Sequence, residues 1–164
     1  RIEKVKKEIQ RVVDLLDIKF GGFNLEIMID KQDRVYIIEM GPRNGGNMIP
    51  DLLNMINGVD LVAATVETAL GNNSFRLTYR YNDGFYATYN IHTDKNGSFI
   101  GVKYKNGIED KIIREVIYKK KGDYVEYFDA ANKVIGILFL KFNTQEEQLE
   151  VMDNPHNWIE VMIE

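Results

Sequence analysis

The sequence contains no cysteine. Disulfide bonds are therefore excluded, and so are metal centres built on thiolate ligands. The sequence also has no glycine-rich phosphate loop and no dinucleotide-binding fingerprint of the G-x-G-x-x-G kind. A nucleotide site in this chain would have to be recognised from other residues.

A strong net charge is missing as well. The formal net charge is -4, with basic and acidic residues mixed along the chain, which argues against nonspecific nucleic-acid binding. The short basic run Lys119–Lys121 precedes Gly122 and is interpreted as a solvated hairpin turn. No apolar run reaches membrane-spanning length and no signal peptide is visible, so we expect no membrane partner and a cytoplasmic protein.

With 164 residues, 45% of them hydrophobic, the chain can form one domain or two small ones. The residue pattern changes near Asn72, so we predict two parts, residues 1–72 and 73–164. The first part opens with apolar residues at helical spacing, which predicts an amphipathic helix: Ile2, Val5, Ile9, Val12, Val13 and Leu16.

The rest of the first part is predicted to contain strands Phe23–Asp30 and Val35–Met40, a loop over Gly41–Asn47, and helices that begin at Pro50 and Asp60. Proline suits the first turn of a helix, and aspartate is a good N-cap. Gly58 and Gly71 are expected to end the two helices, because glycine readily takes the left-handed conformation found there.

Beyond Asn72 apolar and polar residues alternate, which predicts a β-rich part. Strands are predicted over 75–81, 85–92, 112–118, 124–128, 134–142 and 158–163. The run Asp94–Gly97 predicts a tight hairpin turn. Thr144 and Glu147 have the spacing of a capping box, which predicts a helix to about Met152.

Two glutamates interrupt the apolar runs of the first two strands. With the turn at Lys31–Arg34, residue 30 pairs with 35, residue 28 with 37, and Glu26 with Glu39. Both carboxylates then share one face of the sheet, although like charges in facing positions destabilise it. A bound magnesium ion, which prefers oxygen ligands, would explain why the chain carries both.

Two alternatives exist for these glutamates. A turn shifted by one residue would put Glu26 and Glu39 on opposite faces of the sheet. Both side chains could also simply point to solvent. The residues after Glu39 favour the metal pair.

The segment Glu39–Gly46 reads EMGPRNGG and resembles the Glu-x-Asn-Pro-Arg-x-Gly-Gly motif of ATP-grasp enzymes. The similarity is closest to the carboxylate–amine ligases, including amino-acid ligases, and extends to biotin carboxylase and carbamoyl-phosphate synthetase. It covers Asp17 to about Gly71, and Tyr118–Thr144 is less closely similar to the C-terminal subdomain of these ligases. The resemblance implies an α+β fold: the C-terminal half of an ATP-grasp domain, with an antiparallel hairpin and helices, followed by a small β-rich subdomain.

The resemblance also implies an ATP-dependent ligase that activates a small carboxylate as an acyl phosphate for attack by an amine. By motif position, Glu26 and Glu39 would hold magnesium, or manganese, at the ATP phosphates. Arg43 is the predicted catalytic residue, because its planar fork of donors matches a phosphate or a carboxylate. Asn44, next to it, is a further predicted contact to the nucleotide.

One position departs from the family pattern. The family usually has an asparagine metal ligand two residues after the second glutamate, where this sequence has Gly41. This puts the second metal site in doubt. The register that pairs 26 with 39 also pairs 24 with 41, so Asn24 is predicted to be the substitute ligand. The alternative is that Asn24 only caps a turn.

The resemblance places the adenine pocket and the phosphate-binding lysine upstream, and the sequence does not begin with methionine. We therefore expect a C-terminal piece of a longer enzyme, inactive by itself, whose partner is the upstream remainder of its own chain; the oligomeric state is open. Two rival functions remain: a degenerate, non-catalytic ATP-grasp module, and a carboxylase-like or carbamoyl-phosphate synthetase-like enzyme that activates bicarbonate. His92, at a predicted strand end, is interpreted as structural rather than as a proton shuttle.

Overall fold

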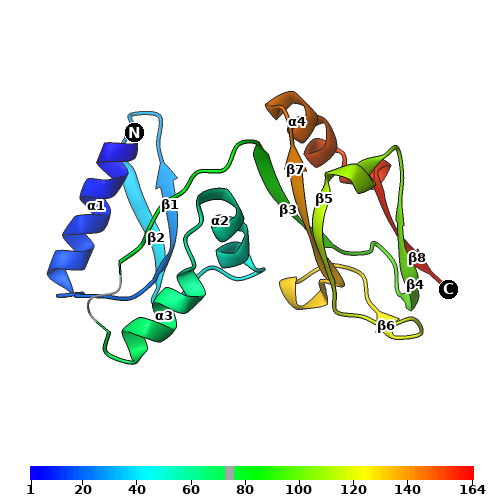
Figure 1. Ribbon diagram of the computed structural model, residues 1–164, viewed down its shortest axis with the longest axis horizontal. Coiled ribbons are helices and arrows are strands. Elements are labelled where there is room, and N and C mark those ends of the chain that lie inside the picture. Colours follow the sequence, from blue (N-terminus) through cyan, green and yellow to red (C-terminus); the bar gives the residue numbers. More distant parts are fainter. Residues whose placement is uncertain (73–75) are drawn as a thin grey trace. The chain divides into compact units, whose positions relative to one another are not determined.

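The computed structural model of the chain describes residues 1–72 and 76–164. Its contacts divide the chain into two compact units, Arg1–Arg80 and Tyr81–Glu164 (Figure 1). Helices and antiparallel strands together confirm the predicted α+β class. The predicted boundary after residue 72 adjoins residues 73–75, which lie outside the described part of the chain.

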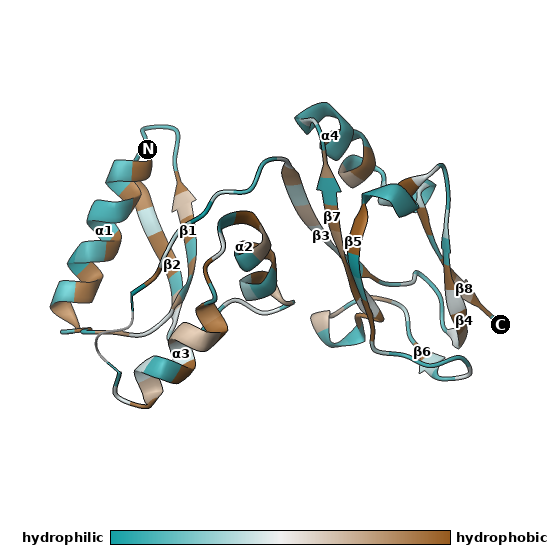
Figure 2. Cartoon of the chain, viewed as in Figure 1, coloured by the Kyte–Doolittle hydropathy of each residue, from teal (hydrophilic) through white to brown (hydrophobic). Residues whose placement is uncertain are grey.

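The first unit is built around one antiparallel hairpin, β1 (Asn24–Ile29) and β2 (Val35–Gly41). Helix α1 (Ile2–Leu15) packs against β2, and α2 (Ile49–Asn57) contacts α3 (Leu61–Ala69). Figure 2 shows hydrophilic and hydrophobic residues alternating along α1, as the helical spacing predicts. These elements agree with the sequence-based prediction to within a few residues.

The helix ends of the first unit follow the predicted signals. The Asp60 carboxylate accepts a hydrogen bond from the backbone N–H of Ala63 at 2.8 Å, which caps α3. Gly58 and Gly71 have φ angles of 71° and 82°, in the left-handed region that favours glycine. No single helix of the described residues is both long and apolar enough to span a membrane, and α2 with α3 passes that test only as a pair bent by 111°.

The predicted strand over 75–81 is wrong for residues 76–81, which form neither strand nor helix, while Phe75 lies outside the described residues. The apolar side chains of this segment are exposed, up to 78% for Tyr81. The backbone N–H of Arg80 instead donates to the carbonyl of Asn57 at 2.6 Å. Alternation alone forms no strand without a neighbouring strand to pair with.

The second unit contains two three-stranded antiparallel sheets, with strand orders β3-β7-β5 and β6-β4-β8. Its elements are β3 (Phe85–Ile91), β4 (Gly97–Tyr104), β5 (Ile112–Ile117), β6 (Tyr124–Val125), β7 (Gly136–Phe142), α4 (Gln145–Asp153) and β8 (Ile159–Ile163). Short 3-10 helices cover Ile108–Lys111, Ala131–Lys133 and Pro155–Asn157. The strands predicted beyond residue 84 are present, although β6 is shorter than expected and β4 was not predicted.

The predicted hairpin at Asp94–Gly97 is wrong, since β3 pairs with β7 while β4 pairs with β6 and β8. The connection carries the chain from one sheet to the other. Thr93 is buried at its start, where its hydroxyl accepts from the backbone N–H of Lys95 at 3.1 Å. The carbonyl of Thr93 accepts from the backbone N–H of Phe128 at 2.9 Å, so this bend bonds to a distant segment rather than closing a hairpin.

The capping box at the start of α4 is confirmed. The Thr144 hydroxyl accepts from the backbone N–H of Glu147 at 3.2 Å, and the Glu147 carboxylate accepts from the backbone N–H of Asn143 at 3.0 Å. Lys111 adds an ion pair to Glu147 at 3.1 Å. These donors, the Asn143 N–H first, lower the pKa of Glu147.

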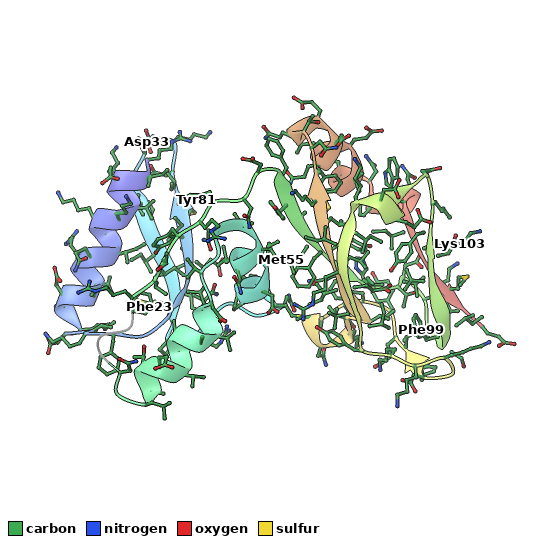
Figure 3. The ribbon with its side chains drawn as sticks, viewed as in Figure 1. Phe23, Asp33, Met55, Tyr81, Phe99 and Lys103 are labelled. Carbon is green, nitrogen blue, oxygen red and sulfur yellow. The ribbon has the colours of Figure 1, made fainter. Side chains whose placement is uncertain are left out.

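The apolar core of the described residues lies almost entirely in the second unit. Strand β7 is buried at every position except Lys141, and Phe99, labelled in Figure 3, packs into the same cluster from β4. The first unit buries Val59 and Pro50. The two units therefore differ sharply in how much apolar surface they remove from water.

Candidate functional site

The turn between β1 and β2 is organised by Asp30. Its carboxylate accepts from the backbone N–H groups of Gln32 and Arg34, both at 2.9 Å, and from the Arg34 guanidinium at 2.6 Å. The backbone N–H of Arg34, first among these donors, helps to hold the pKa of Asp30 below its usual range. Asp33 takes a left-handed φ of 58°, and its carboxylate pairs with Arg1 at 2.7 Å, beside the start of α1 (Figure 3).

The strand register brings the two glutamates together. Glu26 lies opposite Glu39, and Asn24 lies opposite Gly41, as predicted. The register then shifts by one residue, so that Ile27 pairs with residue 37 and Ile38 bulges out of the ladder. The predicted pairs of residue 28 with 37 and 30 with 35 are therefore wrong. The backbone N–H of Asp30 donates to the carbonyl of Arg34 at 3.1 Å, so the turn is one residue shorter than predicted. The extra residue at Ile38 compensates for the shorter turn, which keeps the carboxylates in facing positions.

Both glutamates are exposed, and no described residue donates a hydrogen bond or an ion pair to either carboxylate. The part of the chain that the structure describes contains no group of three or more histidine, aspartate or glutamate side chains that could hold a metal. The possible site is thus a carboxylate pair alone. Oxygen ligands of this kind suit magnesium, which usually takes its remaining ligands from water and phosphates.

The other face of the hairpin belongs to the packing of the first unit. Val12 and Leu16 of the α1 region line one cavity together with Met40 of β2 and with Phe23, which precedes β1, so Met40 lies on the α1 side of the hairpin. Leu25, which alternates with Glu26, is half-buried. The glutamate face is therefore the side of the hairpin that α1 leaves open.

Three apolar side chains extend the glutamate face toward the turn. Met28, Tyr36 and Ile38 are 52%, 39% and 56% exposed. Met28 shares the face of Glu26 by alternation, and Tyr36 is paired with Met28 across the hairpin. Sequence reasoning missed this surface. Alternation alone could have identified Met28, whereas Tyr36 reaches this face only because of the bulge at Ile38.

Gly41 leaves room on the glutamate face. A Cβ atom at this position would meet nothing closer than 4.0 Å, one of its neighbours being a Glu39 carboxylate oxygen. The side-chain oxygen of Asn24 lies 3.4 Å from the corresponding Cβ position of Gly45, at the start of the loop. The role of Asn24 as a substitute metal ligand stays a prediction.

The loop after β2 presents Arg43 to solvent. Its backbone N–H donates to the carbonyl of Gly41 at 2.8 Å, and one guanidinium nitrogen donates to the carbonyl of Asn44 at 2.9 Å. No ion pair joins Arg43 to any other described residue. Its guanidinium is therefore positioned by the loop while keeping donors for a ligand.

Asn44 anchors this loop to α3. Its amide nitrogen donates to the Thr65 hydroxyl at 2.9 Å and to the Leu61 carbonyl at 3.3 Å. Its amide oxygen lies only 2.7 Å from where a Cβ of Gly22 would be, so a side chain at position 22 would have to displace the Asn44 amide. These bonds give Asn44 an anchoring role in the loop. The contact between Asn44 and a nucleotide stays a prediction.

A cavity of about 500 Å³ lies behind this loop, between the end of α1, the segment before β1, and α3. Apolar side chains form most of its wall, and Arg43, Asn44, Thr65 and Thr68 are its polar lining. The glutamates do not line it. The sequence-predicted residues therefore divide between two neighbouring places: Glu26 and Glu39 on the open strand face, and Arg43 with Asn44 on the loop.

His92 lies in the second unit and has a structural environment. Its Nδ1 donates to the carbonyl of Asn90 at 2.6 Å, and its ring packs against Tyr89 and Phe128. This agrees with the structural interpretation of the sequence.

No protein-family profile and no curated protein sequence matches the chain. Solved structures do match. Phosphoribosylglycinamide synthetase from Anaerococcus prevotii superposes with a TM-score of 0.74 at 21% identity, over 99% of this chain and 42% of the other. L-amino acid ligase from Bacillus licheniformis superposes with a TM-score of 0.71 at 18% identity, over 98% of this chain and 40% of the other.

A third match is the biotin carboxylase domain of the 2-oxoglutarate carboxylase from Hydrogenobacter thermophilus, solved with MgADP and bicarbonate. Its TM-score is 0.62 at 20% identity, over 88% of this chain and 32% of the other. The chain thus spans less than half the length of each of these enzymes, all of which are ATP-grasp ligases. The chain has the fold of the C-terminal part of an ATP-grasp ligase.

Proposed function

We propose that this chain is the C-terminal part of a cytoplasmic ATP-dependent ligase that joins a small carboxylate to an amine through an acyl phosphate. The observation that carries the proposal is the register of the hairpin. Glu26 and Glu39 face each other, exposed and without a cationic partner among the described residues. An arrangement that costs stability in a plain sheet is useful where a cation binds.

The residues present fit a magnesium ion. Glu26 and Glu39 offer two carboxylate groups, whose oxygens are hard ligands, on an open face of the hairpin. Gly41 leaves space beside them, and Asn24 lies directly across the hairpin from Gly41. Glu26 and Glu39 would hold the ion, and Asn24 would be the substitute ligand. When bound, the ion would supply positive charge to the phosphate groups of ATP.

The chain's own residues would then position and stabilise the reactants. A carboxylate oxygen attacks the γ-phosphorus and ADP leaves; the amine nitrogen then attacks the acyl carbon and phosphate leaves. Arg43 would bind the carboxylate or the transferred phosphoryl group through its guanidinium fork.

The bicarbonate-activating alternative rests on the biotin carboxylase match, which covers less of this chain than the two matches above it. The non-catalytic alternative rests on Gly41, which removes one expected ligand. The proposed function and the two alternatives differ in the substrates that they require for ADP release. The amine ligase needs a carboxylate and an amine, the carboxylase-like enzyme needs bicarbonate, and the module needs neither because it does not release ADP.

The test is ADP release by the full-length protein, assayed with panels of amino acids and other small carboxylates, with amines, and with bicarbonate, in magnesium. We expect Glu26→Gln and Glu39→Gln to lower turnover roughly hundredfold or more, the size seen when a group that stabilises transition-state charge is removed. Glu3→Gln, an identical change at an exposed position on α1, is the matched control. Near-normal turnover of both hairpin variants would contradict the proposal.

The 164-residue chain alone should release no ADP above the level of its Glu39→Gln variant, because the resemblance places the phosphate-binding lysine upstream. Steady, magnesium-dependent ADP formation by the isolated chain would show that the nucleotide site is complete within it.

A further inference from the structure

Strand β8 forms an edge of its sheet, since the order β6-β4-β8 gives it β4 as its neighbour. Its two ends show which way its backbone groups point. The carbonyl of Trp158 accepts from the N–H of Lys105 at 2.9 Å, and Glu164 exchanges both backbone bonds with Ser98, at 2.9 and 3.0 Å. The carbonyl of Trp158 and both backbone groups of Glu164 therefore point toward β4, while the N–H of Trp158 bonds to the carbonyl of Pro155 at 3.0 Å.

In an antiparallel ladder this direction alternates from residue to residue. Glu160 and Met162 consequently bond to β4 as well, while Ile159, Val161 and Ile163 direct their N–H and C=O groups to the open edge. None of these outward groups is bonded to a described residue. The register irregularity of this pair lies on β4, so β8 itself presents a regular edge.

The β3 edge of the other sheet differs. The Gln148 side chain donates to the carbonyl of Tyr86 at 2.8 Å, and the His92 ring donates to the carbonyl of Asn90 at 2.6 Å. Side chains thus occupy carbonyl groups along β3, as expected of an edge that must not pair with another chain. Within the described residues, β8 receives no such cover.

The sequence of β8 is complementary to itself. If two copies pair in antiparallel orientation about Val161, this residue faces its own copy, Ile159 faces Ile163, and Glu160 faces Met162. Every outward N–H and C=O group of the strand then meets a partner, because the outward residues face one another. No like charges face each other across the new pair.

The surroundings of the edge carry both signs of charge. Glu160 is paired with Lys105 at 2.6 Å, and this lysine, followed by Lys103 and Lys95, lowers the pKa of the Glu160 carboxyl, which keeps it ionised. A cavity of about 600 Å³ beside β8 has Lys95, Lys105, Asp94 and Glu160 as its charged lining, and the end of β3 contributes uncharged side chains to the same cavity. Two copies brought together there would therefore bring opposite charges into reach.

We propose that β8 is a dimerisation edge, through which two copies of this chain pair antiparallel about Val161 and join their β6-β4-β8 sheets into one continuous sheet. The interface is isologous, because the same strand serves both copies.

The test is sedimentation equilibrium of the 164-residue chain over a range of concentrations, with substitutions at Met162, which is 36% exposed in the single chain. Met162→Lys places a cation opposite Glu160 of the second copy and should tighten the dimer. Met162→Glu places a like charge there and should weaken it. Because the contact occurs twice in the dimer, we expect the two dissociation constants to differ about tenfold.

Leu149→Lys and Leu149→Glu make the same changes on exposed α4 and should leave the dissociation constant unaltered. A second readout is hydrogen exchange of the Val161 and Ile163 amides, which should become slower as the protein concentration rises. A chain that stays monomeric up to about 1 mM, a very weak affinity for a protein dimer, would overturn the proposal. A dimer whose affinity and β8 amide exchange ignore residue 162 would overturn it equally, because its interface would lie elsewhere.

Discussion

The two units of this chain bury very different amounts of apolar surface. In the second unit β7 lies in the middle of a sheet and is almost completely buried, with Leu138, Leu140 and Phe142 inaccessible to solvent. In the first unit the hairpin keeps Met28 and Ile38 about half exposed. Yet the candidate metal ligands, Glu26 and Glu39, are found in the open unit.

The difference shows how the candidate site is held in place. A two-stranded hairpin is marginal by itself, so its geometry here depends on local bonds. Asp30 closes the turn through backbone and guanidinium donors, and Asn44 anchors the following loop to α3. A face that binds a ligand has to remain accessible to solvent. In this chain the accessible face is held in place by short-range hydrogen bonds rather than by a buried core.

The largest expected effect is on stability, and it comes from a substitution in the buried core of the second unit. Leu138→Ala removes a fully buried side chain from the centre of β7 and should cost about 2–5 kcal/mol of unfolding free energy. Ile38→Ala removes a similar side chain that is 56% exposed, and its cost should be far smaller. Denaturant unfolding monitored separately in each unit measures both.

Equal destabilisation by Leu138→Ala and Ile38→Ala would contradict the contrast between the units. It would mean that the glutamate face is covered in solution. NMR line broadening of Ile38 by a soluble paramagnetic probe separates two explanations. Weak broadening would show that the glutamate face is covered, and strong broadening would show that the core of the second unit tolerates Leu138→Ala.

The second prediction concerns catalysis in the open unit. Arg43→Lys keeps the charge but loses the fork, so turnover of the full-length protein should fall about tenfold, equal to roughly 1.4 kcal/mol of transition-state stabilisation. Stability should change little, because Arg43 is exposed and its side chain bonds only to the neighbouring carbonyl of Asn44 among the described residues. Arg11→Lys on α1 is the matched control. Wild-type kinetics in Arg43→Lys would reduce this residue to a surface arginine.

The third prediction concerns the turn that replaces a core. The pKa of Asp30 is lowered in the folded chain, so the ionised carboxylate contributes stability above its unfolded pKa of about 3.9. That contribution is lost as the pH falls below about 4 and through the folded pKa. In an acid titration of the hairpin amides, Asp30→Asn should start less stable at neutral pH and lose less on acidification. An unchanged acid profile would show that the Asp30 carboxylate does not hold the turn.

The smallest expected effect tests whether Asn24 replaces the metal ligand that is missing at Gly41. Asn24→Ala should raise the magnesium concentration needed for half-maximal turnover by a few-fold. Gly41→Asn should be tolerated, since its Cβ would meet nothing closer than 4.0 Å, and should partly rescue Asn24→Ala. If Asn24→Ala instead lowers stability without changing the magnesium requirement, Asn24 only caps the turn.

The facing pair of glutamates could be predicted from the sequence, but the register that was used to predict it differs from the real one near the turn. The facing of Glu26 and Glu39 was derived from a turn at Lys31–Arg34 and a regular ladder. The turn is actually one residue shorter, because the backbone N–H of Asp30 bonds to the carbonyl of Arg34, and the bulge at Ile38 restores the register. Bulges depend on local twist and packing, so residue alternation cannot place them.

The failed predictions share one cause, which is that strand pairing is a tertiary property. Residues 76–81 alternate but have no described strand to pair with, and Asp94–Gly97 has a hairpin composition but connects two different sheets. The buried side chain of Thr93 and the bond from Phe128 decide that bend. Local signals such as the caps at Asp60 and Thr144 succeeded because their partners lie within four residues.

The central claim is that Glu26 and Glu39 form a divalent-cation site, and paramagnetic manganese tests it most directly. Titrating Mn²⁺ into the 164-residue chain should broaden the NMR signals of residues 24–28 and 36–41 before all others. In Glu26→Gln and Glu39→Gln this selective broadening should disappear, while Glu3→Gln should retain it. Broadening that starts elsewhere, or that survives both hairpin substitutions, would contradict the account.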